Sequence, residues 1–164
     1  MELHQQLTLP QSVEKVWAAL NDPKMLQQCL PGCERFEAVG PDQFEMTVST
    51  KIGPVKAKFT GKIALSDLNP PLSYVIKGEG KGGVAGFAKG SATVSLATIA
   101  SEQGEATRLT YSVEASVGGK IAQLGGRLIQ GAARKMAQDF FTKFVQALCE
   151  DETLVPEIET VSAP

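Results

Sequence analysis

The composition of the chain is typical of a single globular domain. The chain has 164 residues, of which 43% are hydrophobic and 21% are charged, and its formal net charge is -2. A chain of this length can bury a sizeable core without disulfides or metal ions. The near-zero charge gives no electrostatic reason to expect nucleic acid as a partner, and a single His excludes a His-rich metal site.

The start of the chain and its three cysteines give no sign of secretion. The first ten residues, MELHQQLTLP, do not resemble a signal peptide, and no stretch approaches the ~20 apolar residues of a membrane span. We therefore expect a cytoplasmic protein with reduced thiols. Cys29 and Cys33 stand in CLPGC, a poor spacing for zinc, so we interpret this segment as a tight turn rather than a metal or redox site.

The first third of the chain predicts one strand and two short helices. Residues 2–9 alternate between apolar and polar side chains, which indicates a strand with one exposed face that includes His4. Ser12 is a suitable N-cap for a helix that begins at Val13 and is ended by Asn-Asp-Pro at 21–23. A second helix is expected over 24–30.

Two further patterns follow, one of strands and one of a long helix. Between residues 36 and 117 apolar and polar side chains alternate in runs separated by short turns, which predicts about six antiparallel strands. From Lys120 to about Leu148 the apolar spacing becomes helical and predicts one helix of about 29 residues, or about 43 Å. The last residues are acidic and contain no Lys or Arg.

These elements predict an α+β fold with one domain and a tail. A curved antiparallel sheet of about six or seven strands wraps around the long C-terminal helix, and two short helices follow the first strand. Residues 1–149 form the domain. Residues 150–164 form an acidic, disordered tail.

Small residues favour a hollow between the sheet and the long helix. The helix begins with Gly125, Gly126, Gly131, Ala132 and Ala133, and glycine within a helix costs about 1 kcal/mol relative to alanine. Room for a ligand and close helix–sheet contact are both sufficient reasons for such a stripe, and we favour room for a ligand. The residues predicted to line this cavity are Leu26, Phe44, Met46, Phe59, Tyr74, Ile76, Tyr111, Val113, Leu124, Leu128, Ala132, Met136 and Phe140.

The predicted cavity contains no recognisable catalytic group. Tyr74 and Tyr111 are the inward residues with a polar group, and each could donate a hydrogen bond to a ligand carbonyl or, as an ordinary core residue, to the backbone. His4 lies on the exposed face of its strand, and the acids lie in turns, at helix ends or on polar positions. The segment GEGKGG, at 78–83, lacks the spacing of a phosphate loop and is interpreted as a hairpin end. We therefore expect neither a catalytic nor a metal site.

Several segments carry a resemblance to a known family. They are Asp22-Pro23 with Leu26, LPGC at 30–33, IGPVKAKFTGK at 52–62, GSATVSL at 90–96 and VGGKIAQLGGRLIQGAARKMAQDFF at 117–141. In these segments the chain resembles the CoxG family of carbon monoxide dehydrogenase subunits, within the helix-grip, START-like (SRPBCC) superfamily of hydrophobic-ligand binders. The resemblance implies the helix-grip fold.

The resemblance also implies a function. It implies a non-catalytic accessory protein, without covalent cofactor, of a carbon monoxide dehydrogenase-type molybdenum hydroxylase. The cavity would bind a quinone, menaquinone or ubiquinone, and link the enzyme to the membrane quinone pool from the cytoplasm or the inner face of the membrane. Gly126 stands where the family usually has Ser, and an acidic tail stands where many members have an apolar anchor, so transient membrane contact is expected. The alternatives are an assembly, maturation or membrane-recruitment factor, and a polyketide cyclase-like enzyme.

Overall fold

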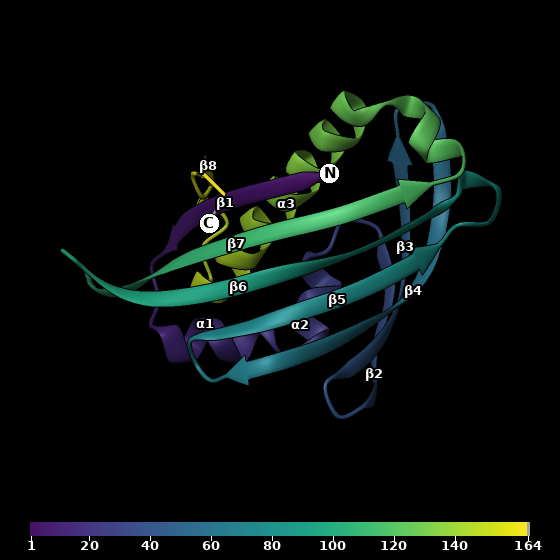
Figure 1. The fold of residues 1–164 in the computed structure, drawn as a ribbon. Helices are drawn as coiled ribbons and strands as arrows, with labels where there is room; N and C mark the ends of the chain where they lie inside the picture. The colour runs from purple at the N-terminus through teal and green to yellow at the C-terminus, as the bar shows by residue number, and fades with distance from the viewer. Residues whose placement is uncertain (164) are drawn as a thin grey trace.

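A strongly curved antiparallel sheet dominates the computed structural model, which describes residues 1–163 (Figure 1). The strands are β1 (Glu2–Leu9), β2 (Cys33–Gly40), β3 (Gln43–Ile52), β4 (Val55–Asn69), β5 (Ser73–Lys81), β6 (Phe87–Ser101), β7 (Gly104–Gly118) and β8 (Glu159–Thr160). The helices are α1 (Val13–Leu20), α2 (Pro23–Cys29) and α3 (Gly126–Cys149), with short 3-10 turns η1 (Gly83–Ala85) and η2 (Lys120–Leu124). The predicted α+β architecture is confirmed.

The strand order is that of a meander closed by the first strand. Neighbouring strands run β2-β3-β4-β5-β6-β7-β1-β8. Short turns connect β2 to β7 in sequence, so each of these strands pairs with the next, whereas β1 pairs with β7 from the far end of the domain. The helices α1, α2 and α3 all lie on one side of this sheet (Figure 1). Seven long strands match the predicted number, and the two-residue β8 is an addition.

Side-chain hydrogen bonds cap the N-termini of the two short helices, which lie at one end of the sheet. The Ser12 hydroxyl accepts a hydrogen bond from the Lys15 backbone N–H at 3.3 Å, and the Asp22 carboxylate accepts one from Lys24 N–H at 3.0 Å. Pro23 stands in the first turn of α2, where its missing N–H costs nothing. The helix α1 buries Val13, Val16, Ala19 and Leu20 against the main core.

The predicted long helix is divided at Gly125, which corrects the expected start at Lys120. Gly125 has φ 89° and ψ 155°, a backbone conformation essentially confined to glycine. This conformation interrupts the helical hydrogen-bond ladder. Residues 120–124 therefore form the separate turn η2, and the α-helix begins at Gly126.

The acidic tail, expected to be disordered, packs against the domain over much of its described length. After Glu150, Leu154 and Ile158 pack against the main core and β8 pairs with β1. The Nε2 amides of Gln138 and Gln146 donate hydrogen bonds to backbone carbonyls of the tail at 3.2 and 3.0 Å. Charge alone suggested disorder, but these apolar side chains give the segment a buried face. Pro164, the last residue of the expected tail, lies outside the described residues.

The apolar interior consists of two separate clusters. The main cluster joins α1, β1, β5, β6, β7 and the second half of α3, and its largest fully buried side chain is Phe144. The smaller cluster is built on Val55, Ala85 and Ile121, with Phe59 and Leu124 packed against it. It lies where η1 and η2 meet the turn between β3 and β4. The candidate functional site borders the main cluster.

Candidate functional site: an apolar cavity

A cavity of about 230 Å³ lies between the sheet, the second half of α3 and the two short helices. Strands β3 to β7 form one wall, two phenylalanines of α3 form the other, and α1, α2 and β2 close one end. The lining residues are Leu20, Asn21, Leu26, Leu30, Phe36, Phe44, Ile63, Leu65, Tyr74, Ile76, Ala92, Val94, Leu109, Tyr111, Phe140 and Phe141. Almost the entire lining is therefore hydrocarbon.

Aromatic rings form the helix side of the cavity. Phe140 and Phe141 contact each other edge to face with ring centroids 5.0 Å apart, and Phe141 stacks on Tyr111 of β7 at 5.5 Å. Phe144, one turn further along α3, stacks on Phe140 at 5.7 Å and is fully buried. Side chains three or four residues apart share a helix face, so this spacing turns all three rings toward the sheet.

Three polar side chains interrupt the apolar lining. The Asn21 Nδ2 group donates a hydrogen bond to the Trp17 carbonyl at 2.9 Å and thereby closes the end of α1. The Tyr111 hydroxyl donates to Gln5 Oε1, a buried partner directly opposite on β1. The Tyr74 hydroxyl has no hydrogen-bond partner within residues 1–163, although its side chain is buried beside Trp17 with ring centroids 5.1 Å apart. Tyr74 is thus the phenol left without a protein partner.

Burial keeps both phenols neutral. Loss of solvent raises the pKa of Tyr111 to about 12, and burial raises the pKa of Tyr74 further above its ordinary value. A neutral phenol has one O–H donor, which suits the carbonyl oxygen of an uncharged ligand. At neutral pH both phenols are therefore protonated and can donate hydrogen bonds.

The structure brings together some of the residues predicted for the cavity. Those that line it are Leu26, Phe44, Tyr74, Ile76, Tyr111 and Phe140. Others lie elsewhere: Phe59 and Leu124 belong to the smaller cluster, Val113 packs against the main cluster, and Leu128 is 41% exposed. The remaining predicted residues, Met46, Ala132 and Met136, are half-buried and do not line the cavity. Because the sheet is curved, some inward residues line the cavity and others pack into the two apolar clusters. Alternation along single strands does not reveal this division.

Residues that the sequence reasoning did not select make up the rest of the lining. Ile63, Leu65, Ala92, Val94 and Leu109 have inward strand positions, so the alternation pattern already contained their signal. The end of the cavity gave a weaker signal. The residues missed at that end are Leu20, Asn21, Leu30 and Phe36, whose positions depend on how α1, α2 and β2 pack together. On the helix side, Phe141 was also missed.

The glycines of α3 do not face the cavity, contrary to the expectation from the small-residue stripe. Gly125, Gly126 and Gly131 are exposed, and a Cβ atom built on each meets nothing within 4 Å. They therefore do not reflect close helix–sheet contact, and none of them lines the cavity. The hollow lies instead beside the aromatic second half of the helix.

Titratable groups other than the two phenols are absent from the lining within the part of the chain that the structure describes. No Asp, Glu, His, Lys or Cys lines the cavity, and no cluster of three His, Cys, Asp or Glu among these residues could hold a metal ion. His4 lies on the outer face of β1 and does not line the cavity. Its ring nitrogens are enclosed without hydrogen-bond partners, with Glu2 3.7 Å from Nε2, so it is less exposed than predicted.

A larger and more open hollow, of about 1020 Å³, is lined by charged residues such as Lys62 and Glu79 together with uncharged ones such as Gln43 and Ala64. Charged side chains of alternating sign, such as Lys62, Glu79 and Lys89, lie opposite one another on neighbouring strands here. Such a lining is unsuited to an apolar ligand, so we take the smaller cavity as the candidate site. In the described residues no helix combines the length and apolar character needed to cross a membrane.

Comparisons with known proteins agree with this geometry. A model of the CoxG family, described as a subunit of carbon monoxide dehydrogenase, matches residues 6–149. A conserved protein from Geobacillus kaustophilus is 31% identical, with a TM-score of 0.86 over 97% of this chain and 99% of that one. A search of curated proteins gave no match.

More distant structures share the fold alone. A START superfamily protein from Mycobacterium smegmatis is 13% identical, with a TM-score of 0.68 over 91% of this chain and 97% of its own. The ZhuI aromatase/cyclase from Streptomyces sp. R1128 is 10% identical, with a TM-score of 0.65 over 92% of this chain and 94% of its own. These likenesses confirm the predicted helix-grip, START-like fold.

Proposed function

The chain belongs to the CoxG family of carbon monoxide dehydrogenase subunits, and from this premise we propose that it is a non-catalytic accessory protein that binds a hydrophobic small molecule. The observation that carries the proposal is the apolar cavity with a single unpartnered phenol, Tyr74, among the described residues. Such a lining suits holding an uncharged molecule. A hydratase or cyclase activity would instead need an acid or base beside the ligand.

The ligand that fits best is the head of a quinone. The volume of about 230 Å³ is below the roughly 300–1,000 Å³ of pockets that enclose drug-sized ligands, so it suits a ring system of one or two rings. Aromatic neighbours such as Phe140 and Phe141 favour stacking on a flat ring. The Tyr74 hydroxyl can donate a hydrogen bond to a quinone carbonyl. We propose the head groups of menaquinone and ubiquinone as the two candidates.

The proposed partner is a molybdenum hydroxylase of the carbon monoxide dehydrogenase type. The family description names a subunit of carbon monoxide dehydrogenase, and this supports the association. In this role the protein carries the quinone between the enzyme and the membrane quinone pool, from the cytoplasm or the inner face of the membrane. An assembly or maturation factor without ligand carriage is the competing role, and it makes a different prediction for the cavity.

Fluorescence of the single tryptophan offers a direct test. Trp17 contacts Tyr74, so a quinone bound in the cavity should quench its emission. Titration with menaquinone and ubiquinone analogues of short chain length should give saturable quenching. The variant Ala92→Phe fills the cavity and should abolish this signal, whereas Ala97→Phe, exposed on the same strand, should leave it intact.

The same variants separate the two roles. Quinone carriage predicts that Ala92→Phe lowers electron delivery from the hydroxylase to quinone in cell extracts, while Ala97→Phe does not. If neither analogue quenches Trp17 saturably, ligand carriage is wrong. Hydroxylase activity and assembly that are unaffected by Ala92→Phe would then favour the assembly factor.

A further inference from the structure

One end of the molecule, distant from the short helices, gathers basic residues from four segments. The segments are the turn between β3 and β4, the turn η1 between β5 and β6, the turn η2 and the start of α3 (Figure 1). The smaller apolar cluster holds them together, since Val55, Ala85 and Ile121 pack against one another there. We call this end the basic pole. Its basic residues are Lys51, Lys56, Lys58, Lys81, Lys120 and Arg127, all exposed.

The charges of the basic pole are mostly unpaired. Within residues 1–163, Lys58 is the only one of the six with a carboxylate within 4 Å, at 3.1 Å from Glu34. Lys51 and Lys56 lie directly opposite each other on β3 and β4, an arrangement of like charges that destabilises a sheet. Further along the same sheet Lys62 lies opposite both Glu45 and Glu79. The pole thus has the like-charge repulsion that an anionic partner would relieve.

Exposed apolar side chains lie among these charges. Val84, at the tip of η1, is 93% exposed, and Phe87 and Leu128 are 47% and 41% exposed. Leu128 lies over the β3–β4 turn, because a Cβ atom on Gly53 would come within 2.8 Å of its Cδ2. Apolar tips surrounded by lysines have the composition of a surface that enters the headgroup region of a membrane.

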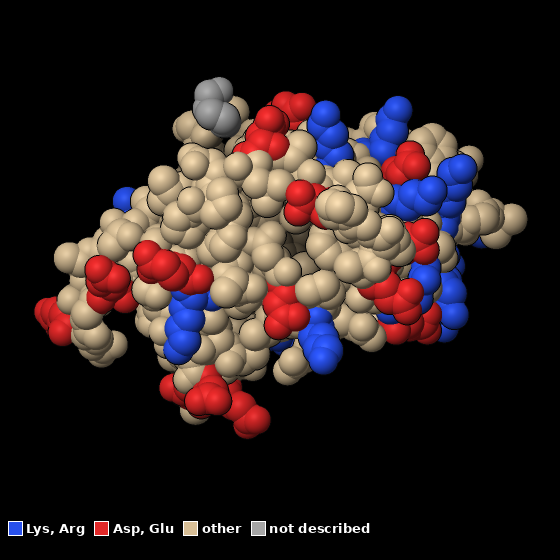
Figure 2. Space-filling model, turned by 90° about the horizontal axis from the view of Figure 1, so that it is seen from below, with Lys and Arg blue, Asp and Glu red and all other residues tan. Residues whose placement is uncertain are grey.

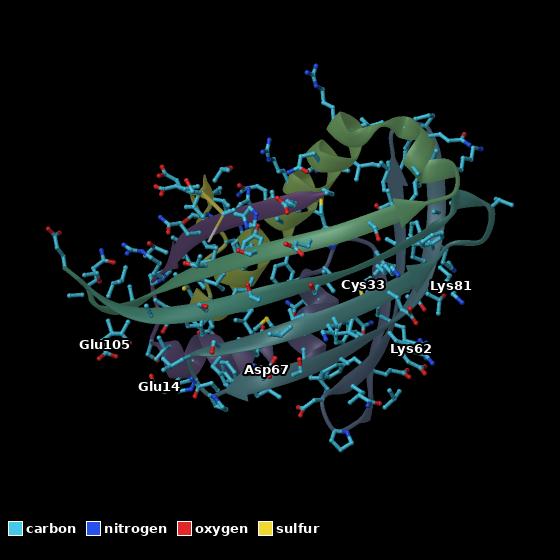
Figure 3. All side chains as sticks on the ribbon, viewed as in Figure 1. Glu14, Cys33, Lys62, Asp67, Lys81 and Glu105 are labelled. Carbon is cyan, nitrogen blue, oxygen red and sulfur yellow. The ribbon has the colours of Figure 1, made fainter. Side chains whose placement is uncertain are left out.

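The basic side chains are more frequent at one end of the molecule than at the other. Figure 2 shows most Lys and Arg side chains of this face toward its right end, which is the end of the β5–β6 turn in Figure 1, with Asp and Glu side chains among them. Toward its left end the charged side chains are mainly acidic. Figure 3 agrees, with Lys62 and Lys81 at the right and Glu14, Asp67 and Glu105 toward the left. An anionic surface would therefore favour the basic pole over the opposite end.

We propose that the basic pole docks on an anionic lipid surface, with Val84, Phe87 and Leu128 entering the interface between the headgroups and the acyl chains. A membrane fits better than an acidic protein, because Lys is depleted from protein–protein interfaces and lysine clusters are typical of anionic lipid recognition. The proposal does not depend on which ligand the cavity holds, since the pole and the cavity border different apolar clusters.

Vesicle flotation with the full chain tests this surface. The protein should float with vesicles of phosphatidylglycerol and phosphatidylcholine at low salt, and it should stay in solution with vesicles of phosphatidylcholine alone or at high salt. Each lysine removed should weaken partitioning roughly fivefold. The variant Lys51→Gln/Lys56→Gln/Lys120→Gln should therefore bind roughly a hundredfold more weakly. Its matched control is Lys15→Gln/Lys24→Gln/Lys77→Gln, which removes exposed lysines outside the pole and should bind like the parent.

A second variant tests insertion apart from charge. Val84→Ser keeps every lysine and lies at an exposed tip, so it should fold normally and still weaken flotation several-fold. The proposal would be overturned by equal loss in the pole variant and its control, or by flotation that is insensitive to lipid charge. Self-association through the pole, seen as a dimer in the absence of vesicles, would also overturn it. Quinone quenching of Trp17 in the pole variant reports separately on the cavity.

Discussion

Tyr111 on β7 and Gln5 on β1 form a buried cross-strand pair, in which the phenol hydroxyl donates a hydrogen bond to Gln5 Oε1. In an apolar interior the phenol needs a hydrogen-bond acceptor and the amide oxygen needs a donor, and each residue meets the need of the other. This hydrogen bond engages one of the two phenols of the cavity, whereas the hydroxyl of Tyr74 remains available to a ligand. The division of roles between the two tyrosines therefore depends on a glutamine in the first strand.

The buried pair should show strong energetic coupling. Gln5→Leu leaves the Tyr111 hydroxyl unsatisfied, and Tyr111→Phe leaves the Gln5 amide unsatisfied, so each should lower the free energy of unfolding by about 1–3 kcal/mol. The double variant should lose clearly less than the sum, because no polar group is then orphaned. Urea denaturation of all four proteins measures the coupling, and additive losses would contradict the pair.

Tyr74→Phe should affect binding more than stability. The hydroxyl has no protein partner to lose within the described chain, so the free energy of unfolding should change by less than about 0.5 kcal/mol. Quinone affinity should fall about threefold to tenfold, the effect of one neutral hydrogen bond. Titration of Trp17 fluorescence measures the affinity. Equal losses of affinity in Tyr74→Phe and Tyr111→Phe would argue against a special role for Tyr74.

Stability should decline at alkaline pH because of the buried phenols. Tyr111 ionises near its ordinary pKa of 10.0 in the unfolded chain, but burial raises its pKa to about 12 in the folded protein. Its contribution to the free energy of unfolding is thus complete below about pH 10. It is lost as pH rises toward about 12, by at most about 1.4 kcal/mol per pH unit. Urea denaturation from about pH 9 to 12 should show a shallower decline for Tyr111→Phe, and identical slopes would contradict this.

Two glycines near the start of α3 should respond oppositely to alanine. Gly131 is exposed within the helix, and a Cβ atom there meets nothing within 4 Å, so Gly131→Ala should stabilise the protein by about 0.5–1 kcal/mol. Gly125 has φ 89°, so Gly125→Ala should destabilise it by about 1–3 kcal/mol. Thermal unfolding measures both. Stabilisation by both substitutions would mean that the helix continues through residue 125.

Much of the fold could be predicted from local patterns. Alternation along single strands predicted the meander, Ser12 marked the beginning of α1, and Asn-Asp-Pro at 21–23 marked the break between α1 and α2. The break at Gly125 could not be predicted, because glycine is compatible with a helix and with the conformation that ends it. The contacts of the tail with the core were not predicted, because its acidic residues outweighed Leu154 and Ile158 in the sequence pattern.

The cavity could be predicted only in part, since it depends on how the sheet bends. Inward positions such as Tyr74 and Ile76 were evident from alternation, and they line the cavity. Met136 and Leu128 have the same helical periodicity as Phe140 but lie nearer the start of α3, outside the main cluster. Which turn of a helix meets which strands is a tertiary property.

Native mass spectrometry of the protein purified from its own cells tests the central claim most directly. Quinone carriage predicts a noncovalent adduct with the mass of a prenylated quinone in the parent protein. The adduct should be retained in Ala97→Phe and lost in Ala92→Phe. A parent protein that carries no adduct, and acquires none when menaquinone or ubiquinone is added, would contradict ligand carriage.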